Sequence, residues 1–249
     1  MSRLAKKLRA KLVDDQTNDW RTYHKMVASL LRPGIRVLDV GCGVGHVAPF
    51  PWDQYPDVEV IGIDPNPEAN HNTNLNRFEL LKDFSNWPVE DNSIDLVLSR
   101  YVLEHVENPE DFFANLTRVL KPGGQFIALT PNHRHPAVIC SGILPLRVKQ
   151  RILKATTGVQ ESDVFPTWYR INTLSKLRRY AQKFDLQIEH LDAREYGPTG
   201  YLDFNVFGFL VSYTYYEAVR WLFLERWFGA SITVVLRKPG LNPKILSST

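Results

Sequence analysis

The chain has 249 residues, of which 44% are hydrophobic and 23% are charged, a composition typical of an ordinary globular protein. Its formal net charge of +3 excludes a polycation that binds nucleic acid through charge alone. Two cysteines, Cys42 and Cys140, are too few for a disulfide framework or a structural zinc site, so we expect reduced thiols in the cytoplasm.

The N-terminus is basic, but the apolar stretch of a secretory signal does not follow it. No uncharged apolar run reaches the roughly 18 residues that a membrane-spanning helix needs. We therefore expect neither a cleaved leader nor a transmembrane helix.

The first half of the chain alternates between helical and strand patterns. Residues 1–31 are predicted to be helical, because apolar side chains recur at helical spacing up to a stop at Pro33 and Gly34. Residues 111–120 are predicted to form an amphipathic helix that ends in the Lys-Pro-Gly-Gly run at 121–124. The predicted strands are residues 35–40, 58–63, 79–81, 94–99 and 125–130.

The second half continues the same sheet with two interruptions. A helix is predicted at residues 173–184, with strands at 186–191 and 231–237, while residues 132–172 and 197–229 are predicted to be cap insertions. The alternation predicts an α/β fold, a doubly wound, mostly parallel, Rossmann-like sheet of about seven strands. The predicted organisation is a helical segment over 1–34, a ligand-binding core over 35–131, and residues 132–249 as the rest of the same domain.

A glycine loop with Gly41, Gly43 and Gly45 follows the first predicted strand directly. Glycine permits tight turns and lets the backbone approach a ligand closely. Asp39 precedes the loop, and Asp64 ends the second predicted strand. Ligands of doubly wound sheets bind beyond the carboxyl ends of the strands, where an acidic side chain accepts hydrogen bonds from ribose hydroxyls. The pattern predicts a site for an adenosyl ligand.

The order and spacing of the motifs over roughly residues 35–132 resemble the class I S-adenosylmethionine-dependent methyltransferases. The likeness is greatest to the small-molecule subgroup that includes ubiquinone and menaquinone methyltransferases. The motifs are Val-Leu-Asp-Val-Gly-Cys-Gly-Val-Gly at 37–45, Ile-Gly-Ile-Asp at 61–64, Asp83-Phe84, Ser-Ile-Asp-Leu-Val at 93–97, Leu-Glu-His-Val at 103–106, and Leu-Lys-Pro-Gly-Gly at 120–124.

The resemblance implies S-adenosyl-L-methionine as the cofactor and gives each motif a role. Asp39 would place the amino group of the methionine, and Asp64 would hold the ribose. Asp83 would meet the adenine amino group, with Phe84 beside the ring. The residues that would line the methionine and ribose portions are Gly41, Gly43, Gly45, Ser99, Arg100 and Tyr101.

An NAD(P)-dependent oxidoreductase is the main alternative for such a glycine loop. Its fingerprint is Gly-x-Gly-x-x-Gly, and His46 stands where the third glycine of that pattern would fall. A P-loop is excluded, because no Gly-Lys-Ser/Thr follows. The spacing therefore favours the methyltransferase.

Methyl transfer needs an aligned acceptor and needs a base only where the acceptor must lose a proton. His105 and His133, which follow the fourth and fifth predicted strands, are the candidate bases. Packing near the site is the alternative for His105, and an ordinary polar loop is the alternative for His133. No carboxylate accompanies His133 and His135, so we expect no metal site.

The acceptor is the least determined part of the prediction. No Asn/Asp-Pro-Pro-Tyr/Phe run follows the fourth strand, which argues against amide and nucleic-acid base substrates, so we expect no nucleic-acid partner. The aromatic segment 201–228 is interpreted as a buried helical cap, a homodimer interface or a shallow membrane contact. Residues 140–171 and 1–11 mix basic and apolar side chains, a pattern typical of interfacial segments or of a solvated helix face.

The predicted function is methylation of a small-molecule, lipid-linked or sugar-linked acceptor, at oxygen in preference to carbon or nitrogen. The alternatives are a non-catalytic module that binds S-adenosylmethionine and the oxidoreductase. The predicted location is the cytoplasm, with peripheral contact to the membrane.

Overall fold

The computed structural model describes residues 3–13, 18–45, 49–143, 166–198 and 205–240. Seven strands form one sheet in the order β3-β2-β1-β4-β5-β7-β6. The strands are β1 (Arg36–Val40), β2 (Glu59–Asp64), β3 (Arg77–Leu80), β4 (Ile94–Arg100), β5 (Leu120–Pro131), β6 (Gln187–Arg194) and β7 (Ser231–Arg237).

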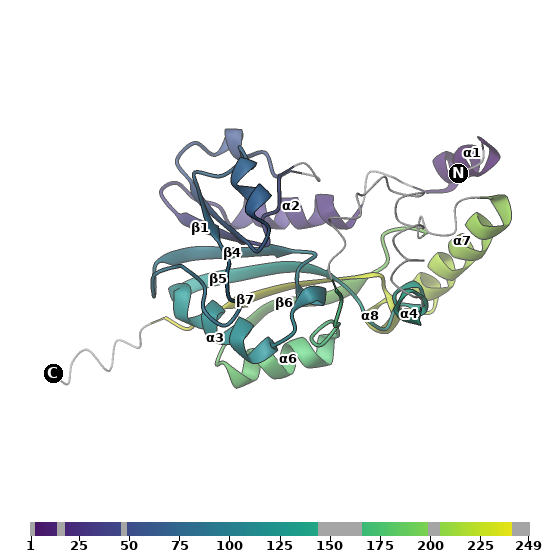
Figure 1. Ribbon diagram of the computed structural model, residues 1–249. Helices are drawn as coiled ribbons and strands as arrows, with labels where there is room; N and C mark the ends of the chain where they lie inside the picture. Colours follow the sequence, from purple (N-terminus) through teal and green to yellow (C-terminus); the bar gives the residue numbers. More distant parts are fainter. Residues whose placement is uncertain (1–2, 14–17, 46–48, 144–165, 199–204, 241–249) are drawn as a thin grey trace.

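The helices around this sheet are α1 (Arg3–Leu12), α2 (Asp19–Leu30), α3 (Pro109–Val119), α4 (Pro136–Ile143), α6 (Leu174–Lys183), α7 (Val206–Trp221) and α8 (Glu225–Phe228). Helix α2 covers one face of this sheet and α3 and α6 cover the other, while the remaining helices lie at one end (Figure 1). Short 3-10 helices are η1 (Trp52–Gln54), η2 (Pro67–His71) and η3 (Leu103–His105).

The predicted fold class is confirmed. Strands β3, β2, β1, β4 and β5 are parallel, and β7 inserts antiparallel between β5 and β6. The chain moves outward from β1 to β3 and then returns to the other side of β1 with β4. Ligands of doubly wound sheets bind beyond the carboxyl ends of the strands at such a reversal, here those of β1 and β4.

Side-chain caps set the starts of the helices that cover the sheet. Asn18, Asn108 and Thr173 each accept a hydrogen bond from a first-turn backbone N–H, at the starts of α2, α3 and α6. In α3, Pro109 occupies the first turn, and Glu110 and Asp111 complement the helix dipole.

The hydrophobic core has one layer on each side of the sheet. On one face, α3 and α6 bury Phe113 and Leu177 against Leu38 and Phe126 of the strands. On the other face, α2 buries Val27 against strand residues such as Val37, Leu98 and Val235. Because side chains alternate along a strand, Asp39 lies on the face that α2 covers.

Two details of the predicted elements are wrong. The segment predicted as one helix over residues 1–31 forms two helices, because Val13 and Asn18 are not helical and Asn18 starts α2 anew. Residues 121–124 were expected to end a helix outside the strand, but α3 ends at Val119 and they belong to β5. The pairing of β4 with β5 is irregular there, since its register shifts between Ile94 and Leu96.

The described helices of the two predicted insertions lie at one end of the sheet. Helix α4 falls within residues 132–172, and α7 and α8 fall within 197–229 (Figure 1). The basic residues 147–154 and the start of the aromatic segment at 201–204 lie outside the described residues. Within the described ranges, no helix combines the length and apolar character needed to cross a membrane.

Helices α1 and α7 pack on each other away from the main core (Figure 1). Ala5 and Val13 are buried against Phe209 in a small hydrophobic cluster of their own. Much of α7 is not buried, since Phe207 is 77% exposed and Trp221 is 77% exposed. The interpretation of the aromatic segment as a buried cap is therefore wrong for α7.

Candidate ligand site at the carboxyl edge of the sheet

The glycine loop follows β1 in the left-handed region of backbone space. Gly41, Gly43 and Gly45 have φ angles of 73°, 51° and 80°. A Cβ on Gly41 would lie 2.3 Å from Cγ2 of Val102, so this glycine is required for packing. A Cβ on Gly43 would meet no atom of the described residues within 4 Å. The Gly43 face of the loop is therefore open to a ligand.

Asparagine side chains from the turn after η2 hold the glycine loop in shape. Nδ2 of Asn72 donates to the carbonyl oxygens of Cys42 at 3.2 Å and Gly43 at 3.0 Å. Nδ2 of Asn74 donates to the carbonyl oxygen of Gly45 at 3.3 Å. Sequence reasoning missed these residues, although asparagines at alternate positions from 70 to 76 were a visible signal.

Asp64 lies at the end of β2, where its carboxylate connects two loops. Oδ2 accepts from the N–H of Gly43 at 2.8 Å, and Oδ1 accepts from the N–H of Asn66 at 2.8 Å. Burial raises the pKa of Asp64, while the two backbone donors act in the opposite direction. A carboxylate has about four lone-pair sites, so acceptor capacity remains for two ligand hydroxyls.

Asp39 is an acidic side chain whose surroundings leave it open to a further donor. No hydrogen bond from the described residues reaches its carboxylate. Burial raises the pKa of Asp39 to about 7, against the opposing effect of Arg100, and Asp64 raises it further. The carboxylate is therefore suited to a cationic ligand group.

Arg100 links this edge to α2. Its Nη1 lies 3.4 Å from Nε2 of His24. Because arginine can only donate a hydrogen bond, the His24 ring is the acceptor and is neutral. Burial, assisted by Arg100, lowers the pKa of His24 to about 4. Phe50 packs edge-on against the His24 ring, with centroids 5.1 Å apart. Arg100 thus lies between a neutral imidazole and the Asp39 carboxylate.

The two neighbours of Arg100 differ in their surroundings. Ser99 is fully buried, and its Oγ has no hydrogen-bond partner among the described residues. Tyr101 has a φ of 57°, a strained value for a side-chain-bearing residue, and its hydroxyl donates to Asp19. Asp19 also accepts from Oγ of Ser231 at 2.8 Å. Tyr101 therefore fastens the end of β4 to the start of α2.

Asp83 and Phe84 lie on the loop between β3 and β4 and are exposed. Asp83 accepts from the N–H and the Oγ of Ser85 at 2.8 and 2.7 Å, which lowers its pKa. Phe84 is 51% exposed and no core cluster includes it. Both side chains remain accessible to a ligand that lies along the sheet edge.

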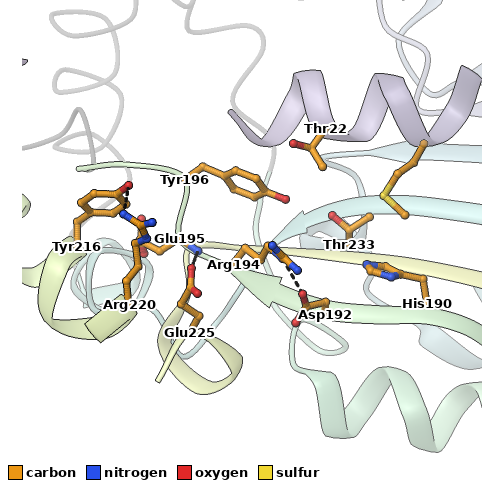
Figure 2. A pocket seen from close by; sticks show the side chains of 11 residues that line it. Thr22, His190, Asp192, Arg194, Glu195, Tyr196, Tyr216, Arg220, Glu225 and Thr233 are labelled. Carbon is orange, nitrogen blue, oxygen red and sulfur yellow. Dashed lines mark hydrogen bonds and ion pairs between the residues drawn. The ribbon is translucent and has the colours of Figure 1, made fainter. Parts of the chain in front are cut away.

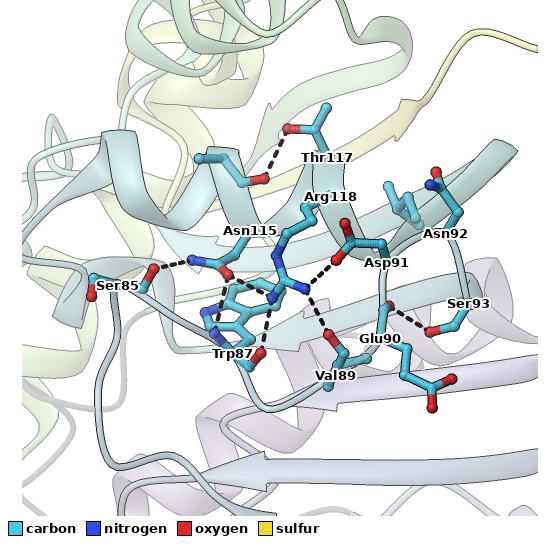
Figure 3. Close-up of polar contacts among 12 residues, drawn as sticks. Ser85, Trp87, Val89, Glu90, Asp91, Asn92, Ser93, Asn115, Thr117 and Arg118 are labelled. Atoms are coloured by element: carbon cyan, nitrogen blue, oxygen red, sulfur yellow. Dashed lines mark hydrogen bonds and ion pairs between the residues drawn. The ribbon is translucent and has the colours of Figure 1, made fainter.

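Helix α3 anchors the rest of that loop (Figure 3). Oδ1 of Asn115 accepts from the N–H of Trp87 at 3.0 Å, and its Nδ2 donates to the carbonyl of Ser85 at 2.9 Å. Arg118 donates to the carbonyls of Trp87 at 2.8 Å and Val89 at 2.7 Å. The loop that carries Asp83 and Phe84 is therefore held in place by α3.

Glu104 is a buried carboxyl group that sequence reasoning passed over. The Asn172 amide satisfies its donors and acceptors when Oδ1 accepts from the Glu104 N–H at 3.2 Å and from Oγ1 of Thr130 at 2.5 Å. Thr130 then donates its single hydroxyl proton to Asn172. The 3.0 Å contact between Thr130 Oγ1 and Glu104 Oε2 therefore requires a proton on Glu104. Burial raises the pKa of Glu104 to about 7, in agreement with a neutral acid.

The two candidate bases lie at the same edge. Nδ1 of His105 lies 2.7 Å from the carbonyl oxygen of Pro166, which can only accept, so Nδ1 carries the proton and Nε2 is the basic atom. Burial lowers the pKa of His105. His133 stacks on Tyr169 at 5.2 Å, and burial together with Lys176 lowers its pKa. Both imidazoles are neutral near pH 7.

His135 lies beside a carboxylate, although none was expected next to His133 and His135. Its Nδ1 accepts from the N–H of Ala137 at 3.2 Å, so the proton lies on Nε2. Nε2 lies 3.3 Å from Oε2 of Glu195, and both side chains are almost fully buried. Among the described residues, no group of three or more histidine, cysteine or acidic side chains could hold a metal ion. Both cysteines are free.

Two clefts lie near these residues. One of about 480 Å³ is lined by α2, β6, β7, α7 and α8 (Figure 2). Its charges pair internally, as Arg194 does with Asp192 at 2.8 Å, and no glycine-loop residue lines it. The other, of about 290 Å³, lies beyond the end of β5 between α6 and α8.

Comparison with known proteins places the chain among methyltransferase domains. The methyltransferase-domain family matches residues 9–191. A ubiquinone biosynthesis O-methyltransferase of Nitrobacter winogradskyi is 29% identical over 173 residues, 67% of this chain and 62% of that protein. A SAM-dependent methyltransferase from Aquifex aeolicus superimposes with a TM-score of 0.51 at 16% identity, over 94% of this chain and 97% of that chain.

The fold of this chain is also similar to that of an enzyme described by a different reaction, a cyclisation. A solved cyclase superimposes with a TM-score of 0.56 at 19% identity, over 90% of this chain and 85% of that chain. The matched region covers only 36%, 40% and 28% of three curated relatives. The chain thus spans less than half the length of these relatives.

Proposed function

The chain belongs to the methyltransferase-domain family, and we propose that it transfers a methyl group from S-adenosyl-L-methionine to a small-molecule acceptor. The observation that carries the proposal is the Asp39 carboxylate, which accepts no hydrogen bond from the described residues, beside a glycine loop whose Gly43 face is open among those residues. Asp64 adds acceptor capacity at the next strand end.

These residues suit the chemistry of the cofactor. Asp39 would accept the ammonium group of its methionine portion, because an unpaired carboxylate gains from a cation. Asp64 would accept the two ribose hydroxyls, and Gly43 would allow the backbone to approach. Asp83 and Phe84 would meet the adenine, as their exposure allows.

When bound, S-adenosyl-L-methionine supplies a methyl group on a sulfonium and leaves as a neutral thioether. The residues of the chain then have to orient the acceptor and exclude water. Nε2 of His105 or a ring nitrogen of His133 would accept the proton of an acceptor hydroxyl, because both rings are neutral near pH 7. Glu104 would hold the segment at residues 168–169, whose N–H groups donate to its backbone carbonyl oxygen.

We further propose an oxygen atom of a lipid-linked or sugar-linked molecule as the acceptor atom. The ubiquinone-biosynthesis O-methyltransferase among the relatives supports oxygen. The exposed aromatic side chains of α7 support an apolar acceptor. The alternative is a module that binds the cofactor without methyl transfer. The solved cyclase supports this alternative, because it shows that a similar fold also serves a reaction other than methyl transfer.

Calorimetry with S-adenosylmethionine and S-adenosylhomocysteine tests cofactor binding, and methyl transfer from labelled cofactor into lipid and sugar fractions tests turnover. We expect both ligands to bind and one fraction to acquire label. Binding without any transfer would favour the non-catalytic module. Failure of both ligands to bind would overturn the proposal.

The affinity for S-adenosylhomocysteine should depend on pH through Asp39. Below its pKa of about 7 the carboxyl group is protonated, and a cationic ammonium binds the ionised form. Affinity should therefore rise about tenfold per pH unit as the pH approaches 7 and level off above it. Titration calorimetry across this range measures the slope.

Asp39→Asn should remove that slope and weaken binding above pH 7. Glu104→Gln is the control, because Glu104 has a pKa in the same range but is bonded to Thr130 and Asn172 instead. An unchanged slope in Asp39→Asn would assign the pH dependence to another group.

We also propose that the protein contacts the anionic surface of a membrane through α1 and α7. Phe207 is 77% exposed beside Leu210, and Leu4 of α1 is 57% exposed. Helix α1 contains five basic residues and no acidic one, and Lys6 and Lys7 are exposed. Apolar side chains next to cations suit an anionic bilayer.

Sedimentation with vesicles measures this contact. Vesicles that contain phosphatidylserine should bind the protein, and Phe207→Ser should weaken binding, while Ile188→Ser on β6 should not. Equal binding by Phe207→Ser would contradict the proposal. A dimer in solution that Phe207→Ser dissociates would assign the surface to a second copy of the chain.

A further inference from the structure

Three arginines line the cleft of about 290 Å³ beyond the end of β5. Arg134 comes from the loop after β5, Arg178 from α6, and Arg226 from α8. Asn132, Ser175 and Trp227 complete most of the lining, and among the described residues no aspartate or glutamate takes part in it. Three distant segments of the chain thus bring like charges to one cleft.

These charges are not neutralised within the described structure. None of the three guanidinium groups forms a hydrogen bond or ion pair with any residue that the structure describes. Elsewhere, Arg36, Arg118 and Arg237 each pair with a carboxylate. Because like charges repel, an anionic ligand would stabilise the arginine cleft.

Asn132 fixes the position of the cleft. Its Nδ2 donates to the carbonyl oxygens of Trp227 at 3.1 Å and Gly229 at 2.9 Å, which joins α8 to β5. Its Oδ1 accepts from the N–H of Arg134 at 3.1 Å. The backbones that carry Arg134 and Arg226 are therefore held by one side chain.

Helix α6 adds a further positive contribution. Ser175 lies in its first turn, which contains no acidic residue, and the N-terminal end of a helix has a partial positive charge. Lys176 is close enough to His133 to lower the pKa of that ring. The electrostatics of the arginine cleft therefore favour a compact anion.

We propose that the arginine cleft binds a phosphoryl group that the methyl acceptor carries. Guanidinium groups match phosphate oxygens in paired hydrogen bonds. Trp227 offers an apolar wall to the attached carbon chain. The assignment of the anion to the acceptor rests on the proposed function, because Asn132 and Arg134 follow β5 at the edge where the acceptor would bind. The binding of the anion does not rest on it.

Binding of inorganic pyrophosphate to the full chain without cofactor tests the proposal by calorimetry. We expect one saturable site that Arg178→Gln weakens by about tenfold or more. Arg179→Gln is the matched control, since Arg179 lies over the Tyr180 ring at 5.3 Å and does not line the cleft. Arg226→Gln, on another element, should repeat the loss and exclude a local folding defect of α6.

Equal binding by wild type and Arg178→Gln, or equal loss in Arg179→Gln, would overturn the proposal. Short-chain phosphatidic acid below its micelle concentration is the second ligand. Tighter binding than pyrophosphate, lost in Arg178→Gln, indicates a lipid phosphate, and equal binding indicates a soluble one. S-adenosylhomocysteine is titrated into the same proteins, so failure of cofactor binding and failure of the arginine cleft are observed separately.

Discussion

Gly43→Ala is expected to abolish cofactor binding while it leaves the fold largely intact. A methyl group at this position meets no atom of the described part of the chain within 4 Å, so that part has room for it. The left-handed φ of 51° costs a side-chain-bearing residue about 1–2 kcal/mol. The methyl group would occupy the open face of the loop, where we propose the methionine and ribose portions lie. Calorimetry with S-adenosylhomocysteine and denaturant unfolding measure the two effects.

Gly34→Ala is a matched control for the backbone strain. Gly34 has a φ of 77°, a Cβ there also meets nothing within 4 Å, and it lies at the opposite end of β1. Gly34→Ala should lower the free energy of unfolding by a similar amount and keep the full affinity for S-adenosylhomocysteine. Gly41→Ala should instead lose stability, because its Cβ would lie 2.3 Å from Cγ2 of Val102. Wild-type affinity in Gly43→Ala would contradict the position assigned to the cofactor.

Asp64→Ala is expected to weaken cofactor binding by about a hundredfold or more. Two hydroxyl groups would lose a charged acceptor, and each such hydrogen bond contributes about 1.5–3 kcal/mol. The N–H groups of Gly43 and Asn66 would also lose their acceptor, so the glycine loop itself would loosen. Titration with S-adenosylmethionine measures the affinity.

Asp64→Asn separates these contributions, because one oxygen still accepts while the charge is lost. It should bind with an affinity between those of wild type and Asp64→Ala. Asp53→Ala, which removes an exposed carboxylate on η1, should bind normally. If Asp64→Ala retained wild-type affinity with an intact fold, the ribose would have to lie elsewhere.

The strands and the glycine loop were predictable because their signals are local. Val37 and Leu38 continue an apolar run that ends in glycines, and β7 has the same apolar character before Arg237. Burial on both faces of a mostly parallel sheet produces such runs. The split of the first helix also had a local signal that the prediction did not use, because residues 14–19 are all polar and Asn18 is a favoured helix cap.

The acceptor edge could not be predicted in the same way. Glu104 and His135 appear in the sequence as one acid and one histidine among many. Their character depends on Thr130, Asn172 and Glu195, which only the fold brings to them. The arginine cleft likewise joins three segments that no local spacing connects. The roles proposed for His105 and His133 stay predictions.

The support of the glycine loop by Asn72 and Asn74 has a consequence for protein engineering. A segment such as residues 37–45 is an attractive unit to transplant, since its motif is short and continuous. Here its carbonyl groups are held by side chains from the β2–β3 connection. A graft of the loop alone onto a foreign scaffold would transfer the glycines without their conformation, so the smallest portable unit reaches from β1 to Asn74.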